Sequence, residues 1–239
     1  MTDRSLFEDM GVGVSKAASI LDEALAGAED GEIYVESVRS ESFLFDDGRL
    51  KSASYDSGQG FGLRVVAGET TGYAHASEIS EASLRRAATA AATAKRGRSA
   101  VLAVGPTPVN RRLYADVDPT ASPDFVTKTG LLAEIDAWCR ARDPKVVQVS
   151  VSLAGSRTGV EIIRSGGATV SEARPLVRLN ISVTMERDGR RETGSAGAGG
   201  RAAYDEWIQP DRWKALAERA LRKAEINLDA IPAPAGEME

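Results

Sequence analysis

The sequence has very few of the residues from which catalytic and metal sites are usually built. Its 239 residues include one cysteine, Cys139, and one histidine, His75. A single cysteine excludes a disulfide within the chain, so nothing points to an oxidising compartment. Zinc catalysis needs at least three protein ligands and an open position, and no HExxH-like spacing is present. The sequence therefore predicts no self-contained metal site.

Long apolar runs and an excess of basic charge are missing as well. No segment approaches the roughly 20 apolar residues that span a bilayer, and residues 1–12 have no apolar core of the kind found in signal peptides. The formal net charge of −5 argues against nucleic-acid binding, because phosphate contacts need a basic face. We expect a cytoplasmic protein that binds neither membranes nor nucleic acids.

The segment 59–76 has the alternating pattern of a strand followed by a tight hairpin. Large apolar residues alternate with Gly60, Gly62 and Arg64, and Gly68-Glu69 supplies a two-residue turn. Pairing across that turn places Gly62 opposite His75. We expect the glycine side of this ribbon to receive an Ala-rich helix that begins after the N-cap residue Ser80 and ends near Lys95.

A second hairpin repeats this pattern later in the chain. Residues 176–186 alternate strictly between apolar and polar side chains, and Asp188-Gly189 predicts a type I′ turn. The return strand over 194–200 has almost no side chains, and a helix is predicted over 210–227. The two copies of the pattern cover about residues 43–95 and 162–223.

The remaining elements are predicted from periodicity and turn residues. In the first half we expect a helix over 14–28 and a strand over 33–45 with a bulge or exposed edge at 37–42. A turn at 46–48, a returning strand over 50–55 and a link at 56–58 would follow. In the second half we expect a helix over 123–141 with Val126, Leu131, Ile135 and Trp138 inward, and then a strand over 147–153 that turns at 156–159 and returns over 160–163.

Together these elements predict an α+β fold with two pattern-related halves. Long antiparallel or mixed hairpins would form the sheet, and the helices would pack mainly on one face. We predict an N-terminal segment at 1–104, a linker at 105–121, a second segment at 122–230 and a Pro-rich connector at 231–239.

The glycine-rich return strand is the main candidate for a binding site. It lacks the GK[ST] ending of a phosphate loop and follows a strand, so phosphate binding is disfavoured. Close packing against a helix is the simplest interpretation. The alternative is that a bare strand edge binds an extended peptide through main-chain hydrogen bonds. The candidate substrate-binding residues are Gly194, Ser195, Gly197, Gly199 and Gly200.

The two lone reactive side chains have structural interpretations that we favour. His75 would cover Gly62 across the hairpin, and Cys139 would be a buried thiol on an apolar helix face. A Cys-His catalytic pair would require the fold to bring them together. The basic doublets at 111–112 and 190–191 are expected on solvated loops or turns.

The strings QGFGLRVVAGETTGYAHASEIS and ARPLVRLNISVTMERDGRRETGSAGAGGR carry a family resemblance. With DDGRLK before the first of them, they resemble the N-terminal region of the TldD branch of the TldD/PmbA family, formerly called modulators of DNA gyrase. The resemblance covers essentially residues 30–239. It implies a cytoplasmic zinc metallopeptidase that trims peptides together with a PmbA/TldE-type partner subunit or by self-association.

The resemblance places the zinc site of such an enzyme outside this chain. The family's HExxxH motif and its downstream cysteine ligand lie in a third segment that would begin just past Glu239, so no zinc ligand or catalytic residue is assigned here. We therefore expect a scaffold or substrate-guiding portion that is inactive alone and connects through 231–239 to a missing catalytic domain. The alternative is a non-catalytic module for protein–protein assembly.

Overall fold

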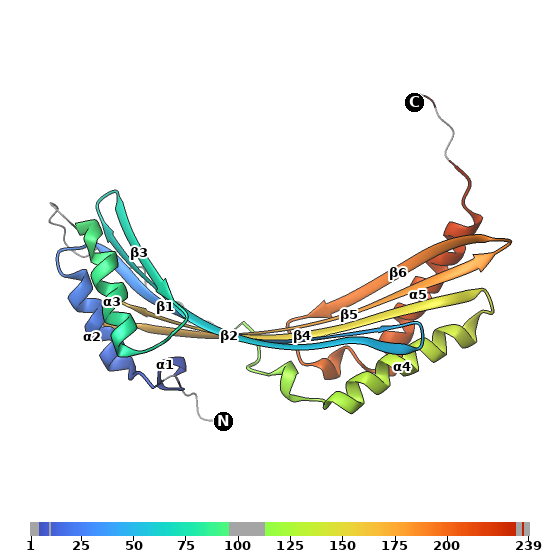
Figure 1. Ribbon diagram of the computed structural model, residues 1–239, viewed down its shortest axis with the longest axis horizontal. Coiled ribbons are helices and arrows are strands. Elements are labelled where there is room, and N and C mark those ends of the chain that lie inside the picture. Colours follow the sequence, from blue (N-terminus) through green and yellow to red (C-terminus); the bar gives the residue numbers. More distant parts are fainter. Residues whose placement is uncertain (1–4, 10, 96–112, 233–235, 237–239) are drawn as a thin grey trace. The chain divides into compact units, whose positions relative to one another are not determined.

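The computed structural model describes residues 5–9, 11–95, 113–232 and 236 (Figure 1). Its strands form one six-stranded sheet in the order β3-β2-β1-β4-β5-β6. They are β1 (Asp30–Asp46), β2 (Arg49–Ala67), β3 (Thr70–Ala76), β4 (Val146–Arg164), β5 (Thr169–Arg187) and β6 (Arg190–Gly200). The predicted α+β class is confirmed.

The helices are α1 (Leu6–Asp9), α2 (Val14–Leu25), α3 (Glu81–Ala91), α4 (Phe125–Arg142) and α5 (Pro210–Asp229). Short 3₁₀ segments occur at η1 (Ala92–Lys95), η2 (Pro119–Ala121), η3 (Ser165–Gly167) and η4 (Tyr204–Glu206). Within the described ranges, no helix combines the length and the apolar character needed to cross a membrane.

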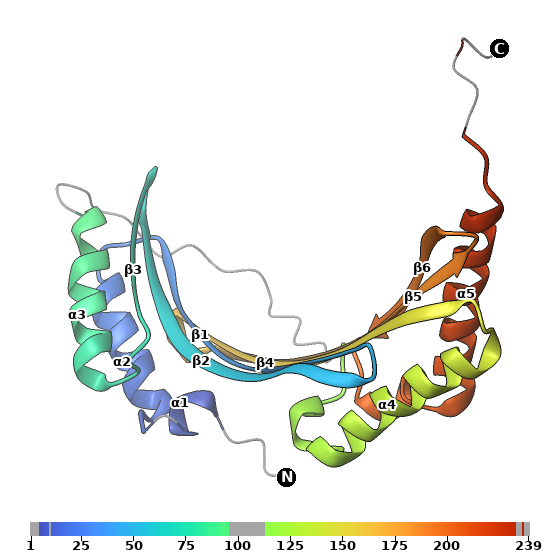
Figure 2. The ribbon, with the colours of Figure 1, turned by 45° about the vertical axis from the view of Figure 1, so that its right-hand side comes forward.

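The chain forms two compact units, and each takes residues from both halves of the sequence. The first unit comprises residues 1–39, 56–116 and 157–174, and the second comprises 40–55, 117–156 and 175–239. Helices α2 and α3 cover one face of the strands in the first unit, as α4 and α5 do in the second (Figures 1 and 2).

The predicted segment boundaries follow the order of the chain, whereas the compact units do not. The division into 1–104, 105–121 and 122–230 therefore stays a prediction. Residues 105–112 of the predicted linker and most of the predicted connector at 231–239 lie outside the described residues.

The order of the elements confirms two pattern-related halves. One half reads α2-β1-β2-β3-α3 and the other reads α4-β4-β5-β6-α5. Each half therefore has a helix, two long strands, a shorter edge strand and a closing helix. The inner strands β1 and β4 are neighbours in the sheet, and the short strands β3 and β6 form its two edges.

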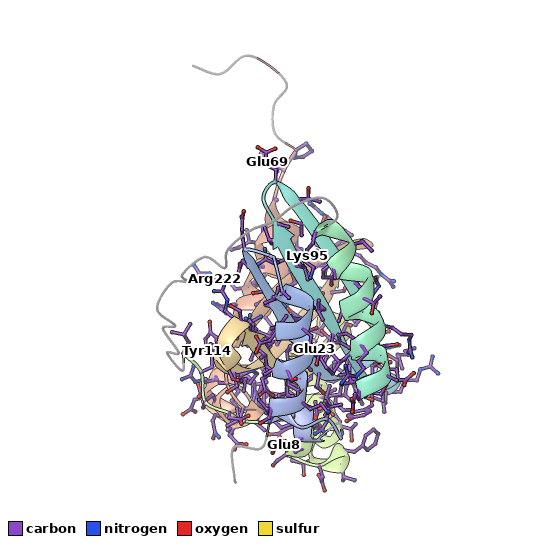
Figure 3. All side chains as sticks on the ribbon, turned by 90° about the vertical axis from the view of Figure 1, so that its left-hand side faces the viewer. Glu8, Glu23, Glu69, Lys95, Tyr114 and Arg222 are labelled. Atoms are coloured by element: carbon purple, nitrogen blue, oxygen red, sulfur yellow. The ribbon has the colours of Figure 1, made fainter. Side chains whose placement is uncertain are left out.

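Both tight hairpins have the predicted register. Gly62 pairs with His75 across the β2–β3 turn, and Glu69 lies at the tip of that hairpin (Figure 3). Glu186 pairs with Arg191 across the β5–β6 turn, where Asp188 and Gly189 have φ values of 52° and 78°. These positive angles are those of a type I′ turn, for which Asp-Gly is a favoured sequence.

The turn predicted at 156–159 is wrong, because β4 continues without interruption from Val146 to Arg164. The link predicted at 56–58 is likewise part of the continuous strand β2. Gly155 keeps a negative φ and lies under Tyr204, whose hydroxyl oxygen would be 2.3 Å from a Cβ at that position. Gly155, which lies just before the predicted turn, is needed for this close packing.

Of the bulge or exposed edge predicted at 37–42, the exposed edge is wrong. Strand β1 lies inside the sheet, between β2 and β4. Its polar stretch spans the boundary between the compact units, after Arg39. Ile33 and Val35 belong to the core of the first unit, whereas Phe43 and Phe45 belong to the core of the second. The residues between these cores need no apolar side chains.

Helix α3 packs on the face of the first hairpin opposite to the one predicted. Phe61 and Leu63 are buried in the core of the first unit, so they face the helices, while Gly60 and Gly62 point to the other face. The close approach instead occurs at Gly72 on β3, where a Cβ would lie 1.9 Å from the carbonyl oxygen of Ala91. Helix α3 lies on this face because it buries the large apolar side chains of β2. Gly72 allows the backbone of α3 to approach β3 closely.

The buried face of α4 is rotated by about one position from the prediction. Ile135 is buried as predicted, and Leu131 and Trp138 are partly buried against the core. Val126, however, is 73% exposed, and Leu132 and Cys139 are fully buried. Lys128 is buried on the same face and fixes this rotation. Its ammonium group donates a hydrogen bond to the Glu41 carboxylate on β1, with an Nζ–Oε1 distance of 2.6 Å.

The Lys128–Glu41 ion pair is the principal buried charge pair of the second unit. The Lys128 side chain is 2% exposed and that of Glu41 is 8% exposed. Lys128 Nζ also lies 4.9 Å from the centre of the Tyr204 ring. Burial raises the pKa of the Tyr204 hydroxyl, and the negative charge of Glu41 adds to this effect.

We predict that Lys128→Met lowers the free energy of unfolding by about 3–5 kcal/mol, because it leaves the Glu41 carboxylate buried without its partner. Chemical denaturation measures this change. The double variant Lys128→Met/Glu41→Leu should recover most of the loss. Equal losses in the single and double variants would contradict the ion pair's role.

We predict that Gly72→Ala lowers the free energy of unfolding by about 1–3 kcal/mol or more, because the new methyl group meets the backbone of α3. Gly58→Ala on β2 is the matched control, since a Cβ there has no atom within 4 Å. Thermal unfolding of both variants tests the contact. A stable Gly72→Ala protein would show that the helix backbone is not held against β3.

Candidate functional site

The predicted glycine-rich segment forms β6, an edge strand of the sheet. It pairs on one side with β5, in a register that runs without interruption from Arg190 opposite Arg187 to Gly200 opposite Val177. Its other side has no neighbouring strand in the part of the chain that the structure describes. No described strand therefore covers the outer edge of β6.

The five candidate residues divide between the two faces of β6. Gly194 and Gly200 point to the helix side, where a Cβ would lie 2.2 Å from the Ala220 carbonyl oxygen and 2.8 Å from the Trp207 ring, respectively. Ser195, Gly197 and Gly199 are exposed on the other face. Close packing against the helix side thus explains Gly194 and Gly200. It leaves Ser195, Gly197 and Gly199 as the exposed candidate residues.

Side chains of α5 close part of the outer edge of β6. Lys223 Nζ donates to the carbonyl oxygen of Ser195 at 2.9 Å, and Asn227 Nδ2 donates to that of Thr193 at 3.0 Å. These carbonyl groups therefore point away from β5. Because successive residues of a strand alternate in direction, the backbone groups of Gly197 and Gly199 also point outward.

The open part of the edge is thus the stretch over 197–200. It continues the outer edge beyond the two carbonyl groups that Lys223 and Asn227 occupy. The residue opposite Gly197 is Asn180, which accepts a hydrogen bond from Arg178 Nε at 3.1 Å and donates one to Ser152 Oγ at 3.3 Å. The exposed face beside the open edge is therefore polar.

Sequence reasoning missed Lys223 and Asn227. The signal was their spacing of four residues, which places two hydrogen-bond donors on one flank of α5 beside its apolar stripe. Their target could not be read from the sequence, because the distance between α5 and β6 depends on the glycine at position 194.

His75 and Cys139 occupy different environments. His75 stacks on Tyr73 with ring centres 5.8 Å apart, and Tyr73, rather than His75, covers Gly62. Cys139 is fully buried in the core of the second unit, as predicted. Burial, with a smaller contribution from Asp136, raises the pKa of its thiol to about 12. Burial therefore disfavours the thiolate that a nucleophile or metal ligand requires.

The described residues do not fit a zinc site. They contain no group of three or more His, Cys, Asp or Glu side chains that could hold a metal ion. His75 belongs to the first unit and Cys139 to the second. No step of a metal-dependent reaction is assigned to this chain.

The basic doublet Arg190-Arg191 lies at the start of β6 and makes local contacts around the second hairpin. Arg190 donates to the carbonyl oxygens of Asn227 and Ala230 at the C-terminal end of α5, at 2.9 and 2.8 Å. Arg191 pairs with Glu186, the opposite-charge neighbour expected from the register. The doublet at 111–112 lies outside the described residues.

Comparisons with known proteins agree in both halves of the chain. The model described as PmbA/TldA metallopeptidase domain 1 matches residues 31–95, and the model of the PmbA/TldA metallopeptidase central domain matches residues 118–228. A metalloprotease TldD homolog of Haemophilus influenzae is 39% identical over 218 residues, which cover 87% of this chain and 44% of the relative. A second TldD homolog, from Buchnera aphidicola subsp. Schizaphis graminum, is 32% identical over 86% of this chain and 44% of its own length.

Solved structures show the same fold at lower identity. A putative modulator of a DNA gyrase from Thermotoga maritima matches with a TM-score of 0.73 and 16% identity, over 96% of this chain and 50% of that protein. TldE from Thermococcus kodakarensis matches with a TM-score of 0.66 and 14% identity, over 88% and 47%, respectively. The chain spans less than half the length of the curated relatives that it matches. From the two family models and these relatives, we conclude that the chain belongs to the PmbA/TldD metallopeptidase family.

Proposed function

We propose that this chain is the N-terminal, non-catalytic portion of a TldD-like zinc metallopeptidase that trims peptides. Its task would be to guide an extended peptide toward a zinc site carried elsewhere in the full-length protein. Family membership and the metalloprotease names of the relatives support this proposal. The same resemblance leads us to propose a cytoplasmic enzyme.

The open edge of β6 over 197–200 is the observation that carries the guiding role. An extended peptide would add there as a further strand, and its backbone would pair with the outward groups of Gly197 and Gly199. Recognition through the backbone would accept many peptide sequences. The side chains of Lys223 and Asn227 would set one end of the paired stretch, because they already occupy the carbonyl groups of Ser195 and Thr193.

A PmbA/TldE-type subunit, or a second copy of the same chain, is the partner that we propose. A specific surface of the second unit also favours the alternative function, an assembly module. Phe125, Val126 and Tyr55 are 52%, 73% and 60% exposed. Phe125 and Tyr55 line a hollow of about 400 Å³ that also includes Phe43 and Pro123. Apolar side chains exposed together are typical of protein contacts.

We predict that Gly197→Val in the full-length protein, assayed with its partner, lowers peptide turnover by about tenfold or more. The new side chain would meet Asn180 Oδ1, which lies 2.3 Å from the Cβ position, and would displace the open edge. A tenfold loss corresponds to about 1.4 kcal/mol, the net value of one or two main-chain hydrogen bonds. Assembly, measured by size-exclusion chromatography with light scattering, should be unchanged.

Thr193→Val is the matched control, because it also places an exposed valine on β6, at a position whose carbonyl group is already bonded to Asn227. It should retain turnover and assembly. If Gly197→Val abolishes assembly, the chain acts as an assembly module. If it changes neither turnover nor assembly, β6 does not guide the peptide.

A further inference from the structure

The helix-free face of the first unit contains a hollow whose floor is made of glycine. Gly58, Gly60 and Gly62 occupy every second position of β2, so all three point to this face. The hollow measures about 460 Å³. It exists because β2 itself contributes no side chain at these three positions. The backbone of a ligand could therefore approach the sheet closely.

Aromatic rings and one carboxylate form the walls of this hollow. Tyr34 and Glu36 line it from β1, and Tyr73 and His75 line it from β3. The rings of Tyr73 and His75 are stacked, with an angle of 29° between their planes. The Tyr73 ring lies across Gly62, since a Cβ at Gly62 would be 2.5 Å from its hydroxyl oxygen.

The Glu36 carboxylate gives the hollow its charge. It accepts a hydrogen bond from the Tyr34 hydroxyl at 2.6 Å. Burial and this contact raise the pKa of Tyr34 to about 12, and the neutral phenol is the hydrogen-bond donor to Glu36. A carboxylate accepts up to about four hydrogen bonds, and the bond from Tyr34 therefore leaves capacity for a ligand.

Arg174 and Arg64 only partly offset the charge of Glu36. Arg174 acts electrostatically on both Tyr34 and Glu36, but its guanidinium group is held by Glu172 through bonds of 2.9 and 2.7 Å. Arg64, on the same face of β2, pairs with Asp30 and Glu32. Glu36, Glu172 and Arg174 together have a net charge of −1, so the hollow is complementary to a cation.

We propose that this hollow binds the guanidinium group of an arginine side chain carried on an extended peptide. A planar guanidinium can stack on a tyrosine ring while it donates to a carboxylate, and the two contacts reinforce each other away from bulk water. The glycine floor admits the peptide backbone beside it. This site belongs to the first unit, whereas the β6 edge belongs to the second, so the proposal does not depend on the guiding role of β6.

The test compares two peptides that differ only in one side chain. Acetyl-Gly-Ser-Arg-Ser-Gly-amide and its citrulline counterpart, in which the guanidinium is replaced by a neutral urea, would be titrated into the isotope-labelled chain and followed by NMR. We expect the arginine peptide to bind at least about tenfold more tightly, with shifts centred on residues 58–62 and 73–77. Equal affinity of the two peptides, or shifts elsewhere, would overturn the proposal.

Two charge variants separate the local carboxylate from general charge, and a third variant fills the hollow. Glu36→Gln should weaken the arginine peptide by at least about tenfold and leave the citrulline peptide unchanged. Glu69→Gln, at the hairpin tip, removes the same charge and should have no effect. Gly58→Val should block both peptides without a clash, because a Cβ there has no atom within 4 Å. Unchanged arginine binding in a folded Glu36→Gln protein, judged by its melting temperature, would contradict the site.

Discussion

The structure depends on two places where a helix backbone touches an edge strand at a glycine. In the first unit, Gly72 admits the backbone of α3 at Ala91. In the second, Gly194 admits α5 at Ala220 and Ala224. A side chain at either position would hold the helix away from the sheet and open the core beneath it. The alanine-rich faces of both helices follow from the same requirement, because larger side chains would also separate the two backbones.

This constraint explains why the two halves share a pattern and why both expose bare surfaces. A short strand that must receive a helix closely has small residues on its helix side. In β6 the opposite face is also nearly bare, which leaves the outward edge of Gly197 and Gly199 accessible. In the first unit the glycines of β2 lie on the helix-free face and create the hollow beside Glu36 and Tyr73. The candidate binding surfaces therefore arise from the same scarcity of side chains as the packing does.

The features that could be predicted from the sequence are those fixed by neighbouring residues. The turns at Gly68-Glu69 and Asp188-Gly189, their strand registers and the N-cap at Ser80 each depend on a few adjacent positions. The failures involve partners far away in the chain. The turn predicted at 156–159 is instead part of β4, which packs at Gly155 against the distant residue Tyr204. The inward face of α4 was predicted incorrectly because a lysine is normally expected on the exposed face of a helix. Lys128 is buried because it pairs with Glu41, which lies on β1. The candidate residues of β6 could be recognised from the high glycine content of this segment. The contacts that Lys223 and Asn227 of α5 make with its edge could not be predicted.

Hydrogen exchange at β6 tests the central claim most directly, since it reports on the outward backbone groups themselves. In the full-length protein the amide hydrogens of Gly197 and Gly199 should exchange faster than those of Ala196 and Ala198, which point toward β5. Addition of an extended peptide should slow the exchange of Gly197 and Gly199 selectively. Protection of these two amides in the free protein, or no change when peptide is added, would contradict an open edge that binds peptide.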